Sequence, residues 1–482
     1  MIIPGQIFAR TAAAGYVLTA LAGAYTVTGQ DAVLSAPGGN PNYTATHYID
    51  PGASGGGDGS QLSPWTWAEF LTNIALDMVV EVMPGTLQEA TTDERFIPAF
   101  QLPMSGTISQ RIMIYAQNRA IDTATTGLRT KLTTTATVGS VNGCPVIGSQ
   151  FRDYITWDGF WIDEVDALPT TDTGPVILNQ CQGVHILGCL LEGMDLTGYD
   201  NWGASPTENH NGIRIEGMQD CVIADNKITG FVNPGGSHNG AGIMSYTSIN
   251  LENNSNNIIE NNEIDNCGCG IYIKGQWAGT NSGSFTVRKN YIHSNQNAGI
   301  EFGGHTGSAS HVYQNLCVAN NHGMMLGRDE VNNVKVYNNT IANSTDTSLF
   351  LKANISSYSG NEFGNNISIN PANAHVSGDQ GPVTGDIIPD YNCYDLNNST
   401  WYINSTSYSS FATYDSGSGA YEDNSINADP VIVGGGDYSL DTGSPCLNAG
   451  VDTLDILGGG TSAPINIGAV VNSDTIGLRL AA

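Results

Sequence analysis

The chain has 482 residues, with 16 basic against 45 acidic residues and a formal net charge of −29. Such a charge repels polyanions, so neither nucleic acid nor an anionic membrane surface is expected as a partner. The nine cysteines show no zinc-type spacing, so no metal site is predicted from them, and their odd number excludes complete internal pairing. Most are expected to be small apolar core residues.

Residues 1–36 are predicted to form a separate unit, which ends at a loop rich in Pro and Gly at 35–41. The apolar run at 11–24 is preceded by a single basic residue, Arg10, so a secretion signal is not favoured. No stretch is long enough to cross a bilayer. Residues 18–34 resemble short β segments of tailed-phage structural and tailspike proteins, which implies that 1–36 is an attachment segment. A leader is the alternative for these residues.

Residues 37–90 are predicted to form an entry region and N-terminal cap. A glycine-rich loop at 55–59 is followed by one short helix near Trp67 and by a first strand at 79–83, which ends in the turn Pro84-Gly85-Thr86. We expect the helix to cover the exposed edge of the first coil of a repeating structure.

A repeated phrase follows further along the chain. Asparagines recur at spacings of 36, 28, 25 and 24, each followed within two residues by Ile or Cys, at Asn226, Asn262, Asn290, Asn315 and Asn339. A period of this length is the signature of a solenoid. Earlier coils are expected at 154–162 and 184–191, where Cys189 occupies the asparagine column.

A second ladder of Gly-Ile or Gly-Met strands runs in register with the first. Its glycines are Gly212, Gly242, Gly270, Gly299 and Gly323. Apolar residues alternate with others at period two in these strands, and helical stripes are missing between them. The pattern predicts that residues 91–430 form a parallel β-helix in which each coil stacks on the last.

The C-terminal residues 431–482 are predicted to form a cap and tail that cover the last coil. Asp429-Pro430, the run 443–450 and Ile467-Gly468-Ala469 resemble the closing segment of right-handed parallel β-helix proteins of the pectate-lyase-like superfamily, and 48–86 resembles their entry region. The resemblance implies an all-β, right-handed parallel β-helix with an N-terminal capping helix and a C-terminal cap. Because that superfamily hosts lyases, hydrolases, epimerases and adhesins, function stays open.

Four insertions, at 194–211, 231–241, 276–284 and 304–310, interrupt the short turns on either side of the Gly-Ile strands. They predict a groove whose floor is formed by the outward residues of those strands. Two of the 16 cations share this face with tyrosines and glutamates. Predicted catalytic residues are Lys274, Tyr246, Arg214 and His238, and predicted substrate-binding residues are Glu216, Tyr272, Glu301, Trp202, Trp277, His210 and Arg328.

The simpler interpretation is that these are solvated charges on an exposed sheet, with the tryptophans packed under their own loops. Against that, Trp202 and Trp277 lie in opposite walls, where flat rings stack on sugars. The site therefore predicts polysaccharide as the partner.

Two enzyme classes compete for this groove. A glycosidase needs two carboxyls about 5 to 9.5 Å apart. Glu216 and Glu301 are three coils apart, hence on the order of 14 Å, which is too far. A hydrolase would instead pair Glu301 with Asp329 or Glu330, or Glu216 with Asp200 or Glu208.

Lyase chemistry needs a base, a cation beside the uronate carboxylate and a donor for the leaving oxygen. Lys274 or His238 fits the base, Arg214 the cation and Tyr246 the donor. Parallel β-helix pectate and alginate lyases use a Lys or Arg base with calcium, which the resemblance supports as a type of site. No tight Asp cluster matching their calcium site is found, so no cofactor is assigned and Ca²⁺ stays open.

The favoured function is β-elimination of a uronate-containing glycan by an extracellular or virion-associated depolymerase. One alternative is a glycoside hydrolase of the tailspike type. The other is a non-catalytic glycan-binding tail protein or adhesin. Tail proteins of this architecture commonly form homotrimers, and the sequence leaves that question open.

Overall fold

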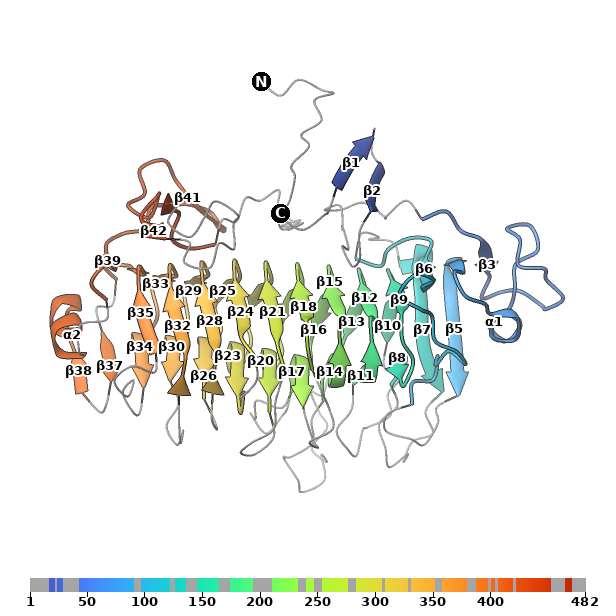
Figure 1. The fold of residues 1–482 in the computed structure, drawn as a ribbon, viewed down its shortest axis with the longest axis horizontal. Coiled ribbons are helices and arrows are strands. Elements are labelled where there is room, and N and C mark those ends of the chain that lie inside the picture. Colours follow the sequence, from blue (N-terminus) through green and yellow to red (C-terminus); the bar gives the residue numbers. More distant parts are fainter. Residues whose placement is uncertain are drawn as a thin grey trace.

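The structure of the chain is a computed structural model. The structure describes residues 17–21, 24–28, 43–90, 97–121, 126–135, 145–163, 174–193, 210–232, 240–246, 254–275, 283–305, 308–327, 331–351, 358–378, 387–397, 400–403, 406–418, 422–451 and 464–469. Short strands from successive coils stack side by side along one axis, with one helix near each end (Figure 1). The predicted right-handed parallel β-helix is confirmed.

The coils build three long sheets, called sheets 1, 2 and 3 below. Sheet 1 has 12 strands: β5 (Gly85–Ala90), β7 (Thr130–Thr135), β10 (Trp161–Asp163), β13 (Leu190–Glu192), β16 (Lys227–Thr229), β19 (Glu263–Asp265), β22 (Tyr291–His293), β25 (Leu316–Val318), β29 (Thr340–Ala342), β33 (Ile367–Ile369), β36 (Cys393–Tyr394) and β39 (Ile426–Asn427).

Sheet 2 has 11 strands: β8 (Ile147–Gln150), β11 (Val176–Gln182), β14 (Ile213–Gln219), β17 (Ala241–Tyr246), β20 (Cys269–Lys274), β23 (Ala298–Gly303), β26 (His322–Leu326), β30 (Thr347–Leu351), β34 (Ala374–Gly378), β37 (Trp401–Ile403) and β38 (Thr406–Tyr408). All of its pairings are parallel except that of β37 with β38.

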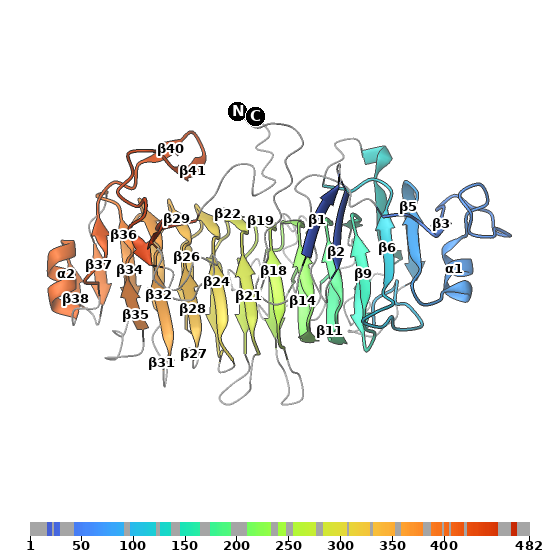
Figure 2. The same cartoon turned by 45° about the horizontal axis from the view of Figure 1, so that its top comes forward.

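Sheet 3 has 12 strands, several of which lie side by side in Figure 2: β3 (His47–Ile49), β4 (Val79–Val82), β6 (Ile112–Ala116), β9 (Ile155–Asp158), β12 (His185–Leu187), β15 (Val222–Ala224), β18 (Asn257–Glu260), β21 (Phe285–Arg288), β24 (Ser310–Tyr313), β28 (Val334–Tyr337), β32 (Asn361–Gly364) and β35 (Ile387–Asp390). The strands β3, β4 and β5 of the predicted entry region 37–90 belong to the long sheets.

The remaining elements lie outside the three sheets. They are β1 (Val17–Leu21) with β2 (Ala24–Thr28), β27 (Val331–Asn332) with β31 (Tyr358–Ser359), β40 (Ile432–Gly434) with β41 (Asp437–Leu440), β42 (Gly450–Val451) with β43 (Pro464–Ile465), the helices α1 (Trp67–Asn73) and α2 (Phe411–Ser418), and a 3₁₀ turn at Thr126–Leu128. Within the described residues, no helix is both long and apolar enough to cross a membrane.

Each coil passes through the sheets in the order 3, 1, 2, as β18, β19 and β20 do. Inward side chains from all three sheets merge into one core cluster that runs the length of the stack, for example Ile259, Ile264 and Ile271 in this coil. Cys317 occupies the isoleucine column of sheet 1 and is buried, as predicted. Each of the eight cysteines within the described residues is a buried free thiol.

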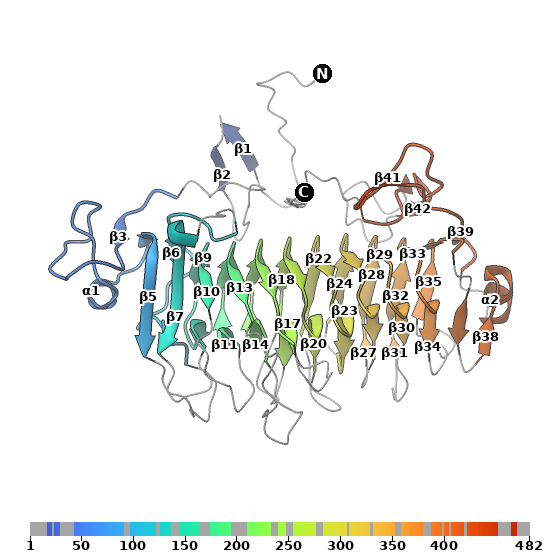
Figure 3. The same ribbon diagram turned by 180° about the vertical axis from the view of Figure 1, so that it is seen from behind.

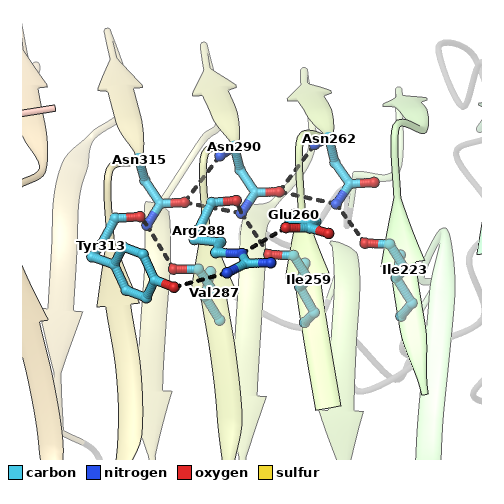
Figure 4. Close-up of polar contacts among 9 residues, drawn as sticks. All are labelled: Ile223, Ile259, Glu260, Asn262, Val287, Arg288, Asn290, Tyr313 and Asn315. Atoms are coloured by element: carbon cyan, nitrogen blue, oxygen red, sulfur yellow. Dashed lines mark hydrogen bonds and ion pairs between the residues drawn. The ribbon is translucent and has the colours of Figure 1, made fainter. Parts of the chain in front are cut away.

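The asparagine ladder joins neighbouring coils at the corner between sheets 3 and 1 (Figure 4). The side-chain amide of Asn290 donates to the carbonyl of Ile259 (3.0 Å) and to Oδ1 of Asn315 (2.9 Å). Its own Oδ1 accepts from the backbone N–H (3.1 Å) and the side-chain amide (2.9 Å) of Asn262. Each asparagine thereby satisfies buried backbone and side-chain groups of two coils.

The ladder is longer than predicted. It continues beyond Asn339 through Asn366 to Asn392, and at its other end the backbone N–H of Cys189 donates to Oδ1 of Asn226 (2.9 Å). The last two rungs continue the spacing, at 27 and 26 residues, although Ser368 and Tyr394 stand where the earlier rungs have Ile or Cys. The spacing rule could therefore have found them.

The glycine ladder marks a second corner where coils approach closely. A Cβ added to Gly270 would lie 2.4 Å from the carbonyl oxygen of Gly299 and 2.4 Å from Cγ2 of Ile292. Because no heavy side-chain atom fits there, these positions are scaffold requirements.

Helix α1 lies at the N-terminal end of the stack (Figure 1). A capping box closes its first turn, in which Thr66 and Glu69 exchange hydrogen bonds. The Trp67 ring packs against Phe100 and Trp157 at centroid distances of 5.2 and 6.3 Å. The helix is thus anchored in the core, and its role as a cap stays a prediction.

At the C-terminal end, two segments contact the last coils, and the cap predicted for 431–482 stays a prediction. The last coil is contacted by α2, whose Phe411 and Tyr414 rings lie 5.7 and 5.6 Å from the Trp401 ring of β37. The described part of 431–482 lies along sheet 1 (Figure 3), where Cys446 and Ile467 pack with Ile367 of β33 and Cys393 of β36. The last coils of sheet 1 carry apolar residues on their outer face, and the C-terminal segment covers these residues.

We predict that Asn290→Ala lowers the free energy of unfolding by about 3 kcal/mol or more, because it leaves several buried donors and acceptors of neighbouring coils unsatisfied. Denaturant titration followed by circular dichroism measures the change. Asn373→Ala is the control, since this exposed asparagine bonds only across the surface to Asp346. Equal effects of the two substitutions would contradict a structural role for the ladder.

Buried ionisable groups predict how stability depends on pH. Burial lowers the pKa of His305 and His375 to about 4, and burial also lowers the pKa of His185. Burial raises the pKa of Glu422, which accepts a hydrogen bond from the Tyr394 hydroxyl (2.6 Å), from 4.5 to about 7. Between about pH 4 and pH 6.5, the unfolded chain binds more protons than the folded chain on these three histidines and fewer on Glu422. The unfolded chain therefore has a net excess of bound protons. Wild-type stability should therefore fall as the pH is lowered from 6.5 to 4.

Substituting Glu422 isolates its own contribution, which has the opposite sign. A raised carboxyl pKa stabilises the fold below pH 4.5, and this stabilisation is lost as the pH rises through 7. Glu422→Gln cannot ionise, so it should gain stability relative to wild type between pH 5 and 8, by about 3 kcal/mol at the upper end. Thermal melting of both proteins across this range measures the difference, and a difference independent of pH would contradict the assignment.

Candidate functional site

Sheet 2 places the predicted residues in two rows on its outer face. In the first row, Arg214 pairs with Met244, which pairs with Tyr272, which in turn pairs with Glu301. The second row contains Tyr246 paired with Lys274, two residues further along β17 and β20. Isoleucines between these positions belong to the core, so the predicted alternation is confirmed.

The phenol ring of Tyr246 lies between the two cations. The guanidinium carbon of Arg214 is 5.5 Å from the centre of this ring, and the ammonium nitrogen of Lys274 is 5.2 Å from it. Lys274 is also 5.8 Å from the centre of the Tyr272 ring. Nε of Arg214 donates to Oε1 of Glu216 at 2.5 Å. Five predicted residues therefore form one cluster, held in part by cation–π attraction.

Arg214 and Lys274 are the only cations on the strands of sheet 2, and Glu216 and Glu301 are the only carboxylates on these strands. In a chain with 16 basic residues, Arg214 and Lys274 place positive charge on one face of sheet 2, two strands apart and in different rows. Glu216 balances part of that charge through its ion pair with Arg214.

Burial corrects the expectation of an open, solvated floor. Arg214, Glu216, Tyr272 and Glu301 are 1%, 2%, 0% and 0% exposed. Tyr246 and Lys274, by contrast, are half-buried. Two charges out of water are tolerated only when they are paired, which explains why Arg214 and Glu216 bond to each other. Lys274 and Tyr246 form the part of the cluster that solvent reaches.

Glu301 lies on β23, three strands from Glu216 on β14. The predicted separation in coils is confirmed, so these two carboxylates do not form a glycosidase pair. The proposed alternative partners Asp200, Glu208, Asp329 and Glu330 lie outside the described residues.

Of the remaining predicted residues, the structure describes His210. His210 is buried, and its ring packs against Phe231 at a centroid distance of 5.1 Å. Trp202, His238, Trp277 and Arg328 lie outside the described residues, so the predicted walls stay a prediction.

His322 was missed from the sequence. Its ring stacks on Phe350 at 4.6 Å with an interplanar angle of 10°, on the same outer face. Phe350 continues the first row, through Met325, from Glu301. His322 stands directly before Gly323 in the glycine ladder, and this position could have identified it from the sequence.

Calcium does not fit this face among the described strands. Calcium takes about six to eight oxygen ligands. Sheet 2 offers two carboxylates three strands apart, one of them ion-paired with Arg214. We therefore assign no step to calcium.

The buried ion pair predicts a specific stability pattern. Glu216→Gln should lower the free energy of unfolding by about 3 to 5 kcal/mol, because it leaves the Arg214 charge buried without its carboxylate. The double variant Arg214→Met/Glu216→Gln should recover most of this loss. Denaturant titration of single and double variants measures the coupling.

Asp163→Asn is the matched control, since Asp163 and Lys131 form an ion pair with side chains 32% and 26% exposed. It should change stability by less than about 1 kcal/mol. Additive losses in the Arg214/Glu216 cycle would show that the pair is not coupled.

No protein-family model matches the sequence, and the comparison with curated proteins gives no match. Among solved structures, pectate lyase Pel9A is similar over 89% of this chain and 97% of its own, with a TM-score of 0.50 and 12% identity. XylC in complex with xylose matches 81% of this chain and 88% of its own, with a TM-score of 0.45 and 11% identity. Similarity at such identity concerns the fold. By its fold, the chain is a right-handed parallel β-helix like that of pectate lyase Pel9A.

Proposed function

We propose that the protein is a carbohydrate-active enzyme that cleaves a uronate-containing polysaccharide by β-elimination at the cluster around Tyr246. The observation that carries the proposal is the placement of Arg214 and Lys274 on either side of one tyrosine. Fold similarity to a pectate lyase is consistent with this class of substrate.

In β-elimination a base removes the proton beside the uronate carboxylate, the bond to the leaving glycosidic oxygen breaks, and a carbon–carbon double bond forms. Lys274 is the base in this proposal, because this residue is only partly buried, whereas Arg214 is fully buried. It must lose its proton before each turnover. The hydroxyl of Tyr246 donates the proton that the leaving oxygen requires.

Arg214 acts at a distance in this scheme. Its guanidinium is buried and bonded to Glu216, so it supplies positive potential beneath Tyr246 without direct contact with the substrate. The low polarity around Arg214 and Glu216 strengthens this potential. The potential stabilises the negative charge that develops on the uronate carboxylate when the base removes the proton from the adjacent carbon.

We predict that Lys274→Ala lowers kcat at least a hundredfold, the size of a typical acid–base contribution, while glycan binding changes little. The assay is ultraviolet absorbance of the new double bond during incubation with polygalacturonate, alginate and glucuronate-containing glycans. Lys335→Ala is the control, because Lys335 is ion-paired with Glu362 on sheet 3.

Tyr246→Phe separates the roles within the cluster. It keeps the ring that faces both cations and removes the hydroxyl, so kcat should fall while KM stays near the wild-type value. If the assay detects new reducing ends but no double bond, the protein is a glycoside hydrolase and the β-elimination proposal is wrong. Binding without any product would replace it by a glycan-binding tail protein or adhesin.

The setting is also a proposal. We propose a polysaccharide partner and an extracellular or virion-associated location, to which the resemblance of residues 18–34 to phage tail proteins points. The described part of that segment is an antiparallel hairpin, β1 and β2, which is compatible with an attachment role.

A further inference from the structure

A cluster of three metal-binding side chains lies on the outer face of sheet 1, away from the Tyr246 cluster. Glu263 and Asp265 are on β19, and His293 is on the neighbouring strand β22 (Figure 2). Asp265 and His293 are register partners, and Glu263 points to the same side as Asp265 because the two are separated by one residue.

The donor atoms converge on a common point. One ligand atom from each of the three side chains lies within 4.8 Å of the other two. Nε2 of His293 is 3.7 Å from Oε1 of Glu263 and 3.8 Å from Oδ2 of Asp265. These distances are too long for hydrogen bonds, but they are below the sum of two metal–ligand bonds of about 2.0 to 2.2 Å each.

The surroundings hold the imidazole in a suitable orientation. Nδ1 of His293 lies 3.3 Å from Oγ of Ser294, and its ring packs at 4.3 Å from the Tyr291 ring. A bond from the second ring nitrogen to a neighbouring group is the usual support of a metal-binding histidine. Nε2 of His293 and Oδ1 of Asp265 are shielded from solvent and have no hydrogen-bond partner.

The donor set selects the kind of ion. One imidazole nitrogen and two carboxylate oxygens suit zinc and related divalent transition metals, whereas calcium and magnesium prefer oxygen ligands alone. The ammonium group of Lys227 bonds to Oε1 of Glu263 at 2.9 Å and would be an outer partner of that ligand. A net charge of −29 favours the approach of a cation.

We propose that Glu263, Asp265 and His293 bind one divalent transition-metal ion, which clips two adjacent coils together next to the C-terminal segment. Tyr291 of the same strand packs with Tyr438 and Ala469 of that segment. The proposal is independent of the reaction at sheet 2. Its competitor is a protonated His293 that forms ion pairs with both carboxylates and binds no metal.

Calorimetric titration of the chelator-treated full chain with Zn²⁺, and separately with Co²⁺ and Ca²⁺, tests the site. One Zn²⁺ or Co²⁺ per chain is expected, with Ca²⁺ bound at least tenfold more weakly. His293→Gln and Asp265→Asn should each raise the Kd for Zn²⁺ at least tenfold. Asp163→Asn, on the same sheet but paired with Lys131, should leave it unchanged.

Thermal melting provides a second readout that does not depend on activity. Zn²⁺ should raise the melting temperature of the wild-type chain and of Asp163→Asn, and should raise that of His293→Gln much less. Circular dichroism verifies that each variant is folded, and Asp265→Asn serves if His293→Gln is not. Absence of saturable binding, equal affinity in the ligand variants, or a preference for Ca²⁺ would overturn the proposal.

Discussion

Every other feature of this molecule depends on the exact stacking of one coil on the next. Parallel strands supply the backbone bonds, and the asparagine ladder from Asn226 to Asn392 fixes each coil against its neighbour at one corner. A slip of one residue in a strand would turn its isoleucines outward and its charged residues inward. The ladder resists such a slip because its amides are buried and would lose their partners.

This register turns residues that are far apart in the sequence into neighbours. Arg214, Tyr246 and Lys274 come from three coils, yet two cations face the same ring. Burial then separates their roles, because Arg214 is fully buried and paired with Glu216, while Lys274 is only partly buried. Arg214 is thus held in place, and Lys274 is accessible to solvent. Charges fixed in advance in this way are what enzymes use to stabilise anionic transition states.

The three sheets do different work on their outer faces. Sheet 2 carries the cation cluster, and the last coils of sheet 1 bury the C-terminal segment through Cys446 and Ile467. Nearer the middle, sheet 1 carries the Glu263, Asp265 and His293 group. On sheet 3, Arg288 links Glu260 and Tyr313 across three coils, as Figure 4 shows. These outward residues do not belong to the main core cluster, so each face carries its own set of side chains.

The sequence by itself determined the repeat, the strand alternation and the face on which each residue lies, because period-two patterns and buried asparagines are local rules. It placed Arg214, Tyr246 and Lys274 together on that basis. Tertiary structure alone decided that Arg214 and Glu216 are buried and paired, and that residues 431–451 lie along sheet 1 while α2 contacts the last coil. Exposure and docking depend on what covers a surface, and no periodic pattern within a strand records that.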